Sequence, residues 1–224
     1  MEVAISDQVR TAYGGLRLAF VEIHGMEIGA DSTKVTDLLN ETSERISKSI
    51  TLEAVKDRPD FRAYRDFFWR LGVDPTKTRP ASEALIRRIL KGSSIPRIND
   101  FVDAYNIASI GTGVPIAAFD LGTIDADVTL RFSDPGEEFL GIGMSSSRML
   151  EQGILIMSSG EDVIAVYPYR DAKESNISLE TVDAVLISCG VPGISVENLT
   201  EAAGRARDFV ISICGGHPSK IRTV

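Results

Sequence analysis

The chain has 224 residues, 43% of them hydrophobic and 25% charged, and it carries a formal net charge of −8 at pH 7. This composition is typical of a globular protein that forms one large domain or two closely packed lobes. The acidic balance argues against a general binder of DNA or other nucleic acid. No apolar run approaches the ~20 residues of a membrane span, and the segment MEVAISDQVR lacks the basic and apolar regions of a signal peptide. We therefore expect no membrane partner and a cytoplasmic location.

Residues that ligate metals are scarce. The histidines are His24 and His217 and the cysteines are Cys189 and Cys214, and none of them lies at ligand spacing from another. Two buried free thiols are favoured, with one isolated disulfide bridge as the alternative. The run GIGMSSS at 141–147 lacks the third glycine of a dinucleotide fingerprint and the Gly-Lys-Ser/Thr of a P-loop. We expect neither a metal nor a cofactor.

The first half of the chain predicts one strand followed by several helices. Continuous apolar runs between glycines are typical of buried strands, and apolar residues at helical spacing indicate amphipathic helices. The expected elements are a strand over Leu16–Ile23, a helix over Asp31–Lys56 with a break near Ser47–Thr51 and a cap at Asp31 or Ser32, and helices over Asp60–Leu71, over Pro80–Lys91 and from Asn99 or Asp100 to Gly111–Gly113. The aromatic face of the Asp60–Leu71 helix favours core packing over stacking on bases.

The second half of the chain predicts strands and one closing helix. We expect strands over Val114–Phe119, Asp127–Phe132, Phe139–Ile142, Ile154–Met157, Val163–Tyr167 and Val182–Ser188, and a helix over Ser195–Ile213. The loop at 158–161 reads as a hairpin connection, and the last segment, GGHPSKIRTV, is expected to fray. This order predicts an α+β fold with mixed or antiparallel sheets rather than a regular βαβ alternation.

Positive charge is concentrated in one segment. Between Lys56 and Arg97 the chain has 11 Lys/Arg and 5 Asp/Glu, a local charge of +6, so the remainder carries −14. Such asymmetry can mark a side that faces a polyanion, although solvated helix faces are the more common explanation. The candidate RNA-contacting residues are Arg87, Arg88, Lys91 and Arg97.

Three polar features of the second half can take part in chemistry. Glu137 and Glu138 precede an apolar strand, where one carboxyl can turn inward and work as an acid or base; an exposed turn is the alternative. Serines such as Ser145 and the backbone N–H groups of 141–146 can bind an anion; the alternative is that this segment is a simple turn at the end of a strand. Arg170 can contact an RNA terminus or a substrate carboxylate; the alternative is that it forms a structural ion pair.

Two long segments resemble a known family. RPASEALIRRILKG…IPRINDFVDAYNIASIGTGVPIAAFDL and IDADVTLRFSDPGEEFLGIG resemble the B3/B4 domain of the phenylalanyl-tRNA synthetase β-subunit, and YPYRDAKESNISLET at 167–181 is similar to that domain's second signature. The resemblance begins at Asp60. It implies a B3/B4-like α+β fold of two intimately associated sublobes with a cleft between them. It also implies an N-terminal α/β extension over 1–58, a B3/B4-like domain over 59–216 and a tail over 217–224.

The resemblance also implies an activity and a pocket. In the synthetase this domain is the editing module, which hydrolyses tyrosine misattached to the phenylalanine tRNA. Bacterial synthetases carry a Thr-Asn pair on the helix before the VPIAAFD-like strand and a histidine on the strand itself, where this chain has Tyr105, Asn106 and Ala117. A histidine mechanism therefore does not carry over. The candidate pocket residues are Tyr105, Asn106, Gly113, Pro115, Ala117, Glu138, Ser145 and Arg170.

Two functions follow as hypotheses. The chain shows no adenylate-binding motifs and is similar to free-standing B3/B4 proteins, so a complete synthetase is not expected. The first hypothesis is hydrolysis of misacylated aminoacyl-tRNA in trans, with water positioned near an already activated ester. The second is a non-catalytic module that binds tRNA or an amino acid. Both imply tRNA or aminoacyl-tRNA as a partner and an amino acid as a possible ligand.

Overall fold

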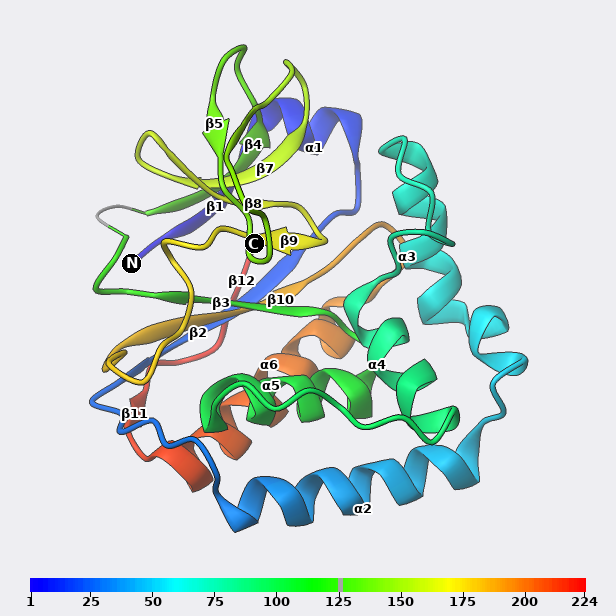
Figure 1. Cartoon of the computed structure of the whole chain (residues 1–224). Helices are drawn as coiled ribbons and strands as arrows, with labels where there is room; N and C mark the ends of the chain where they lie inside the picture. Colours follow the sequence, from blue (N-terminus) through cyan, green and yellow to red (C-terminus); the bar gives the residue numbers. More distant parts are fainter. Residues whose placement is uncertain (125–126) are drawn as a thin grey trace.

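The computed structural model describes residues 1–124 and 127–224. Within them, helices pack against two five-stranded sheets and a two-stranded ribbon, which makes the fold α+β (Figure 1). The helices are α1 (Asp7–Ala12), α2 (Thr33–Ser49), α3 (Pro59–Arg70), α4 (Ala81–Leu90), α5 (Asp100–Thr112) and α6 (Val196–Cys214), with a 3-10 turn at Ala54–Asp57. In this part of the chain, we find no helix with the length and apolar character needed to cross a bilayer.

The two sheets form separate layers. Sheet A has the order β1-β4-β7-β8-β9 and sheet B the order β11-β2-β10-β3, with β12 also paired to β2. The strands of sheet A are β1 (Val3–Ile5), β4 (Val128–Phe132), β7 (Leu155–Ser159), β8 (Asp162–Val166) and β9 (Arg170–Asp171). Those of sheet B are β2 (Leu18–His24), β3 (Ile116–Asp120), β10 (Ala184–Cys189), β11 (His217–Pro218) and β12 (Arg222–Thr223), and the ribbon pairs β5 (Glu138–Phe139) with β6 (Arg148–Met149). Only β1 and β4 pair in parallel among the paired strands described.

Strand β10 lies at the centre of the molecule. It pairs antiparallel with β2 on one side and β3 on the other, and all of its residues are buried. Helices α5 and α6 cover the face of sheet B that points away from sheet A, and α2 packs outside them (Figure 1). Because both faces of sheet B are covered, β2 and β10 are almost continuously apolar, as buried strands are.

The ends of α5 and α6 follow the capping rules. Asn99 caps α5 by accepting a hydrogen bond from the N–H of Val102 at 2.9 Å, and Ser195 caps α6 by accepting one from Asn198 at 3.2 Å. Gly113 ends α5 in a left-handed conformation with φ of 80°, which favours glycine. The predicted helices over Asp60–Leu71 and Pro80–Lys91, the hairpin at 158–161 and the break after Ser49 are confirmed.

Two expectations about the ends of elements are wrong. The tail does not fray, because β11 and β12 both pair with β2 and the N–H and C=O of Val224 bond Leu18. Ser32 begins α2 without a side-chain cap; the carboxyl of Asp100 instead accepts a hydrogen bond from the Ser32 N–H at 2.9 Å. In both cases a distant segment supplies the partner, so local sequence does not reveal it.

Helices α3 and α4 are joined by a buried carboxylate. The Glu83 side chain has no exposed surface and accepts hydrogen bonds from Arg65 of α3 at 3.2 Å and from Arg87 at 2.7 Å. A buried charge is tolerated only when it is paired. Much of the local positive charge in this segment therefore neutralises internal carboxylates.

We expect Glu83→Ala to lower the free energy of unfolding by about 2 kcal/mol, because charged hydrogen bonds are lost and two arginines are left without their partner. Urea unfolding measures the change. The matched control is Glu44→Ala, which breaks an exposed pair with Lys48 and is expected to cost about 0.5 kcal/mol or less. Equal effects in the two variants would contradict a structural role for Glu83.

Candidate functional site

A small cavity lies between the two sheets. Its volume is about 80 Å³, enough for a small side chain or a few waters. Sheet B contributes the start of β3 and the end of β10, sheet A contributes β7, β8 and the turn into β9, and α4 adds its first residue. The lining residues are Ala81, Pro115, Ile116, Ala117, Met157, Ala165, Val166, Tyr167, Pro168, Tyr169, Arg170, Asp171 and Cys189. Both sublobes therefore build this interlobe cavity.

Two buried tyrosines fix the chain where β10 ends. The hydroxyl of Tyr64, from α3, donates to the carbonyl of Cys189 at 2.8 Å, and the hydroxyl of Tyr167, from sheet A, donates to the carbonyl of Gly190 at 2.5 Å. Burial raises the pKa of both phenols well above its usual value, so both stay protonated donors. Gly190 itself has no room for a side chain, since a Cβ there would lie 2.2 Å from the carbonyl oxygen of Arg17.

Asp171 is the unusual group in this cavity. Although some of its surface is accessible, protein atoms surround its carboxyl densely, and burial raises the pKa of Asp171 from 3.8 to about 7. No hydrogen bond or ion pair compensates this carboxyl in the described residues. An unpaired carboxyl with a pKa near neutrality is the kind of group found at functional sites.

The groups around Asp171 are held in their neutral forms. Burial first, and then the charge of Asp171, raise the pKa of the Cys189 thiol, so Cys189 is a poor nucleophile. Burial and the same carboxyl raise the pKa of Tyr105 on α5. Cys189 and Cys214 are both buried and unpaired, which confirms the prediction of free thiols. Asp171 is thus the titratable centre of the cavity.

Three of the sequence-predicted pocket residues meet at this cavity. Pro115, Ala117 and Arg170 all line it, and Tyr105 is near enough for the charge of Asp171 to affect its pKa. Arg170 reaches outward, however: its guanidinium donates to the carbonyl of Ile142 at 3.0 Å. Its stem covers Gly141, where a Cβ would lie 2.5 Å from the Arg170 Cδ.

The other predicted pocket residues lie elsewhere. Asn106 is half-buried on α5 and Ser145 is exposed in the loop between β5 and β6. Gly113 lies at the end of α5, where its carbonyl accepts the hydroxyl of Ser82 at 2.7 Å. Glu138 lines a second pocket, described below. Its neighbour Glu137 does not act as an inward acid, because Arg131 binds it and holds its pKa below the usual value.

Three of the N–H groups expected to bind an anion are already occupied. The N–H of Gly113 donates to the backbone carbonyl of Ser109 at 2.8 Å. The N–H of Ile142 donates to the backbone carbonyl of Asp171 at 2.9 Å, and that of Met144 to the backbone carbonyl of Gly141 at 3.0 Å. In the loop at 141–146, the N–H groups of Ile142 and Met144 are therefore bonded within the fold and are not available to an anion.

The candidate RNA-contacting residues divide into two groups. Arg87 binds the buried Glu83, and Arg97 binds Asp103, so their charges are neutralised within the fold. Arg88 and Lys91 are exposed at the end of α4; Arg88 donates to the carbonyl of Ser94 at 3.0 Å. Exposed positive charge at this end of the molecule is smaller than the local sequence count indicates.

The sequence reasoning chose Arg170 and missed Asp171. Both residues line the cavity, but successive residues of a strand point to opposite sides, and the Arg170 guanidinium reaches away to the carbonyl of Ile142. The signal available in the sequence was that a second charged residue, Asp171, directly follows Arg170. Which of the two side chains points toward the cavity depends on which side of β9 faces sheet B. A strand of two residues is too short for its polar and apolar pattern to reveal this.

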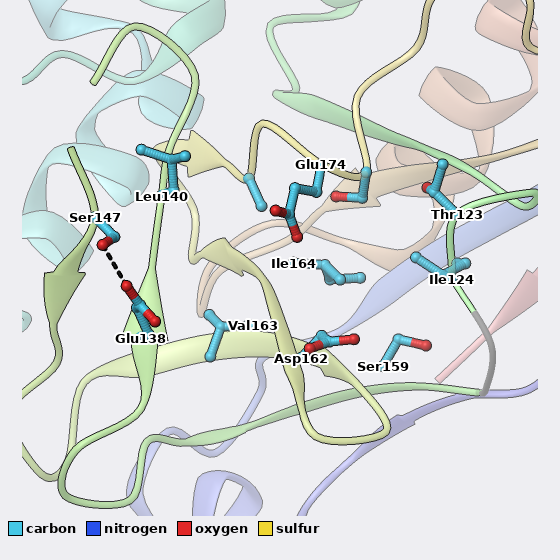
Figure 2. Close-up of a pocket in the computed structure, with 12 residues that line it drawn as sticks. Thr123, Ile124, Glu138, Leu140, Ser147, Ser159, Asp162, Val163, Ile164 and Glu174 are labelled. Atoms are coloured by element: carbon cyan, nitrogen blue, oxygen red, sulfur yellow. Dashed lines mark hydrogen bonds between the residues drawn. The ribbon is translucent and has the colours of Figure 1, made fainter. Parts of the chain in front are cut away.

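A second and larger pocket of about 290 Å³ opens on the other side of the β8–β9 hairpin. We call it the outer pocket. Figure 2 shows the carboxyl groups of Glu138, Asp162 and Glu174 arranged around Val163 and Ile164. The outer pocket is lined by Thr123, Ile124, Glu138, Leu140, Ser147, Ser159, Asp162, Val163, Ile164, Ala172, Glu174 and Ser175. Among the described residues, we find no cluster of three or more His, Cys, Asp or Glu side chains that could hold a metal ion.

The arrangement of two sheets around a cavity, backed by helices, matches a domain of a tRNA synthetase subunit. The fold is similar to an N-terminal fragment of the phenylalanyl-tRNA synthetase β-subunit from Pyrococcus horikoshii, with a TM-score of 0.52 and 11% identity, over 97% of this chain and 50% of that one. Residues 63–213 match the B3/4 domain family. The chain therefore belongs to the B3/4 domain family.

Sequence relatives agree with this assignment. The chain is 30% identical to the phenylalanine–tRNA ligase β-subunit of Aquifex aeolicus over 107 residues, which are 48% of this chain and 14% of that subunit. It is 23% identical to the corresponding subunit of Bacillus cereus over 191 residues, 85% of this chain and 22% of that subunit. The chain thus spans a minor part of the length of these curated relatives.

The raised pKa of Asp171 predicts a pH-dependent stability. Between pH 3.8 and about pH 7 the folded chain keeps a proton that the unfolded chain has lost, so the contribution of Asp171 to stability falls as the pH rises through this interval. We expect Asp171→Asn to gain about 2–4 kcal/mol relative to the parent chain between pH ~4 and pH ~8.

Urea unfolding at a series of pH values measures this trend. The exposed Asp66 on α3 is the matched control, because Asp66→Asn removes the same charge without changing a buried site. If the stability difference between Asp171→Asn and the parent chain stayed constant with pH, the carboxyl would not be buried as described.

Proposed function

We propose that the protein hydrolyses misacylated aminoacyl-tRNA in trans, in the cytoplasm, with the interlobe cavity as its active site. The observation that carries this proposal is the unpaired Asp171 carboxyl in a cavity between the two sheets, within the region that matches the B3/4 domain. The relatives are β-subunits of phenylalanine–tRNA ligase, which supports tRNA as the partner.

Asp171 serves as the general base. In its ionised form it takes a proton from a water molecule, and the water oxygen attacks the ester carbonyl of the aminoacyl group. The bond from that carbonyl carbon to the ribose oxygen breaks, and the ribose oxygen takes up the proton held by Asp171. The amino acid leaves as its carboxylate, and the second proton of the water passes to solvent. A base with a pKa near the working pH is the most effective for such a transfer.

The start of α4 supports binding of an anion beside the cavity. Ala81, the first residue of α4, lines the cavity, and the unpaired N–H groups of a helix N-terminus favour an anion such as a phosphate of the tRNA terminus. On α3, Trp69 is 57% exposed and lies on the helix with Arg62, which is also exposed. An exposed aromatic ring and a cation on the same helix suit contact with an unpaired base and its phosphate.

The size of the cavity limits the amino acid. Pockets for drug-sized ligands have volumes of about 300–1,000 Å³, whereas this cavity has about 80 Å³. Its walls are mainly apolar, with Met157, Ala165 and Val166 from sheet A. We therefore propose that small aliphatic side chains are preferred over aromatic ones.

Deacylation assays test the proposed chemistry. We expect the purified chain to accelerate loss of the amino acid from misacylated tRNA, with a rate that rises through a pKa of about 7. Asp171→Asn is expected to lower this rate by about 10²- to 10⁴-fold, and Asp66→Asn is expected to leave it unchanged. No acceleration with any misacylated tRNA at high enzyme concentration would refute the proposal.

The preference for small side chains is tested separately. We expect faster deacylation of alanyl-tRNA than of tyrosyl-tRNA, because an aromatic ring exceeds the cavity. Val166→Ala enlarges the cavity wall and is expected to raise the relative rate on the larger amino acids, with circular dichroism as the check on folding. A tyrosyl preference in the parent chain would contradict the size argument and leave the role of Asp171 intact.

A second candidate function is a non-catalytic module that binds tRNA or an amino acid. Ala117 favours it, because a methyl group lines the cavity where the resemblance implies a histidine. Here the Asp171 carboxylate would bind the ammonium group of an amino acid. Thermal stabilisation by amino acids or salt-sensitive tRNA binding, without any deacylation, would support this function over the first.

A further inference from the structure

The outer pocket has features that the proposed deacylase does not use. Its three carboxylates come from separate places in the fold: Glu138 from β5, Asp162 from the start of β8 and Glu174 from the segment after β9. Figure 2 shows them on different sides of the apolar centre of the pocket. They converge through tertiary folding and are not a run of acidic residues in the sequence.

Among the residues that the structure describes, these carboxylates have no cationic partner. None of the three forms an ion pair in the described residues, and no Lys, Arg or His is among the residues that line the pocket. Among the described residues, the side-chain hydrogen bond made to these carboxylates is the one that the Ser147 hydroxyl donates to Glu138. Carboxylates of one sign gathered around a concave site concentrate cations there.

A buried hydroxyl in the same pocket supplies an independent observation. Ser175 lines the pocket and is only 3% exposed, and its hydroxyl has no hydrogen-bond partner in the described part of the chain. Leaving a buried polar group unpaired costs about 1–3 kcal/mol. An N–H group of a bound ligand would remove this penalty, because a serine oxygen accepts such a bond.

The floor between the carboxylates is apolar. Val163, Ile164 and Ala172 are buried at 8%, 3% and 7% exposure, and Leu140 extends the same surface. A ligand that fits therefore combines cationic ends with a hydrocarbon body. The volume of about 290 Å³ reaches the lower end of the range for small-molecule sites.

We propose that the outer pocket is a binding site for an aliphatic polyamine. The ammonium groups pair with Asp162, Glu174 and Glu138, the methylene chain lies over Val163 and Ile164, and one N–H bonds the hydroxyl of Ser175. A primary ammonium carries three donors, so it can satisfy a carboxylate and the serine together. This proposal does not depend on the deacylase activity.

Isothermal titration calorimetry of the full chain with spermidine and with putrescine tests the proposal. We expect saturable binding that weakens about tenfold or more in Asp162→Asn and in Glu174→Gln, since each variant removes a charged partner. The matched control is Glu161→Gln, which removes the same charge one residue from Asp162, at a position outside the pocket lining. It is expected to change the affinity less than about twofold, because an exposed carboxylate outside the pocket lining makes no direct contact with the ligand and interacts with it only through solvent.

Ser175→Ala separates ligand binding from a purely structural effect. Removing an unpartnered buried hydroxyl is expected to leave the melting temperature of the free protein unchanged or higher. If the hydroxyl bonds a ligand, the same variant binds spermidine about three- to tenfold more weakly. Unchanged affinity would refute the role of Ser175.

Three results would overturn the proposal as a whole. One is the absence of saturable binding at millimolar spermidine. Another is equal weakening by Glu161→Gln and Asp162→Asn, which would mean diffuse attraction to an acidic surface. A third is tight, saturable binding of Mg²⁺ that displaces spermidine and is lost in Glu174→Gln, which would make the pocket a metal site.

Discussion

The structure depends on the hydrogen bonds that two tyrosines make to the end of β10. Tyr64 reaches the Cys189 carbonyl from α3, and Tyr167 reaches the Gly190 carbonyl from sheet A. Backbone carbonyls that leave a sheet inside a core need such partners, because an unpaired buried carbonyl is costly. These bonds hold the helical layer, sheet B and sheet A at one point, and the interlobe cavity is the space left beside that point.

The same geometry explains why Asp171 is unpaired. The β8–β9 hairpin forms a wall of both pockets, with Ala165 and Asp171 on the interlobe cavity and Ile164 and Ala172 on the outer pocket. Arg170 is drawn away to the loop over Gly141, so the nearest guanidinium does not neutralise the carboxyl. A folded chain retains such an unfavourable group where the rest of the structure determines its position, which is common at functional sites.

Several arginines of this protein neutralise carboxylates within the fold. Arginines bind Glu83, Asp103 and Glu137. An arginine that is paired in this way is not available to bind an external polyanion. The carboxylates of the outer pocket stand in contrast, because no described cation neutralises them. Part of the net charge of −8 is therefore located at that pocket.

The sequence by itself determined the α+β class, the extents of most helices and strands, and the family resemblance. These rest on the periodicity of apolar residues and on local capping and turn chemistry, as at Asn99, Ser195 and the hairpin at 158–161. Of the predicted pocket residues, Pro115, Ala117 and Arg170 do reach one cavity, because they lie in the segments that carry the resemblance.

Only the tertiary structure decided the rest. The tail pairs with β2, Arg87 binds Glu83, and Arg131 binds Glu137. The carboxyl of Asp171, rather than the guanidinium of Arg170, is enclosed between the sheets. The tertiary structure also brought Glu138, Asp162 and Glu174 around one pocket. The physical reason is that burial and charge pairing depend on residues far apart in the chain, whereas periodicity reports only which side of its own helix or strand a residue occupies.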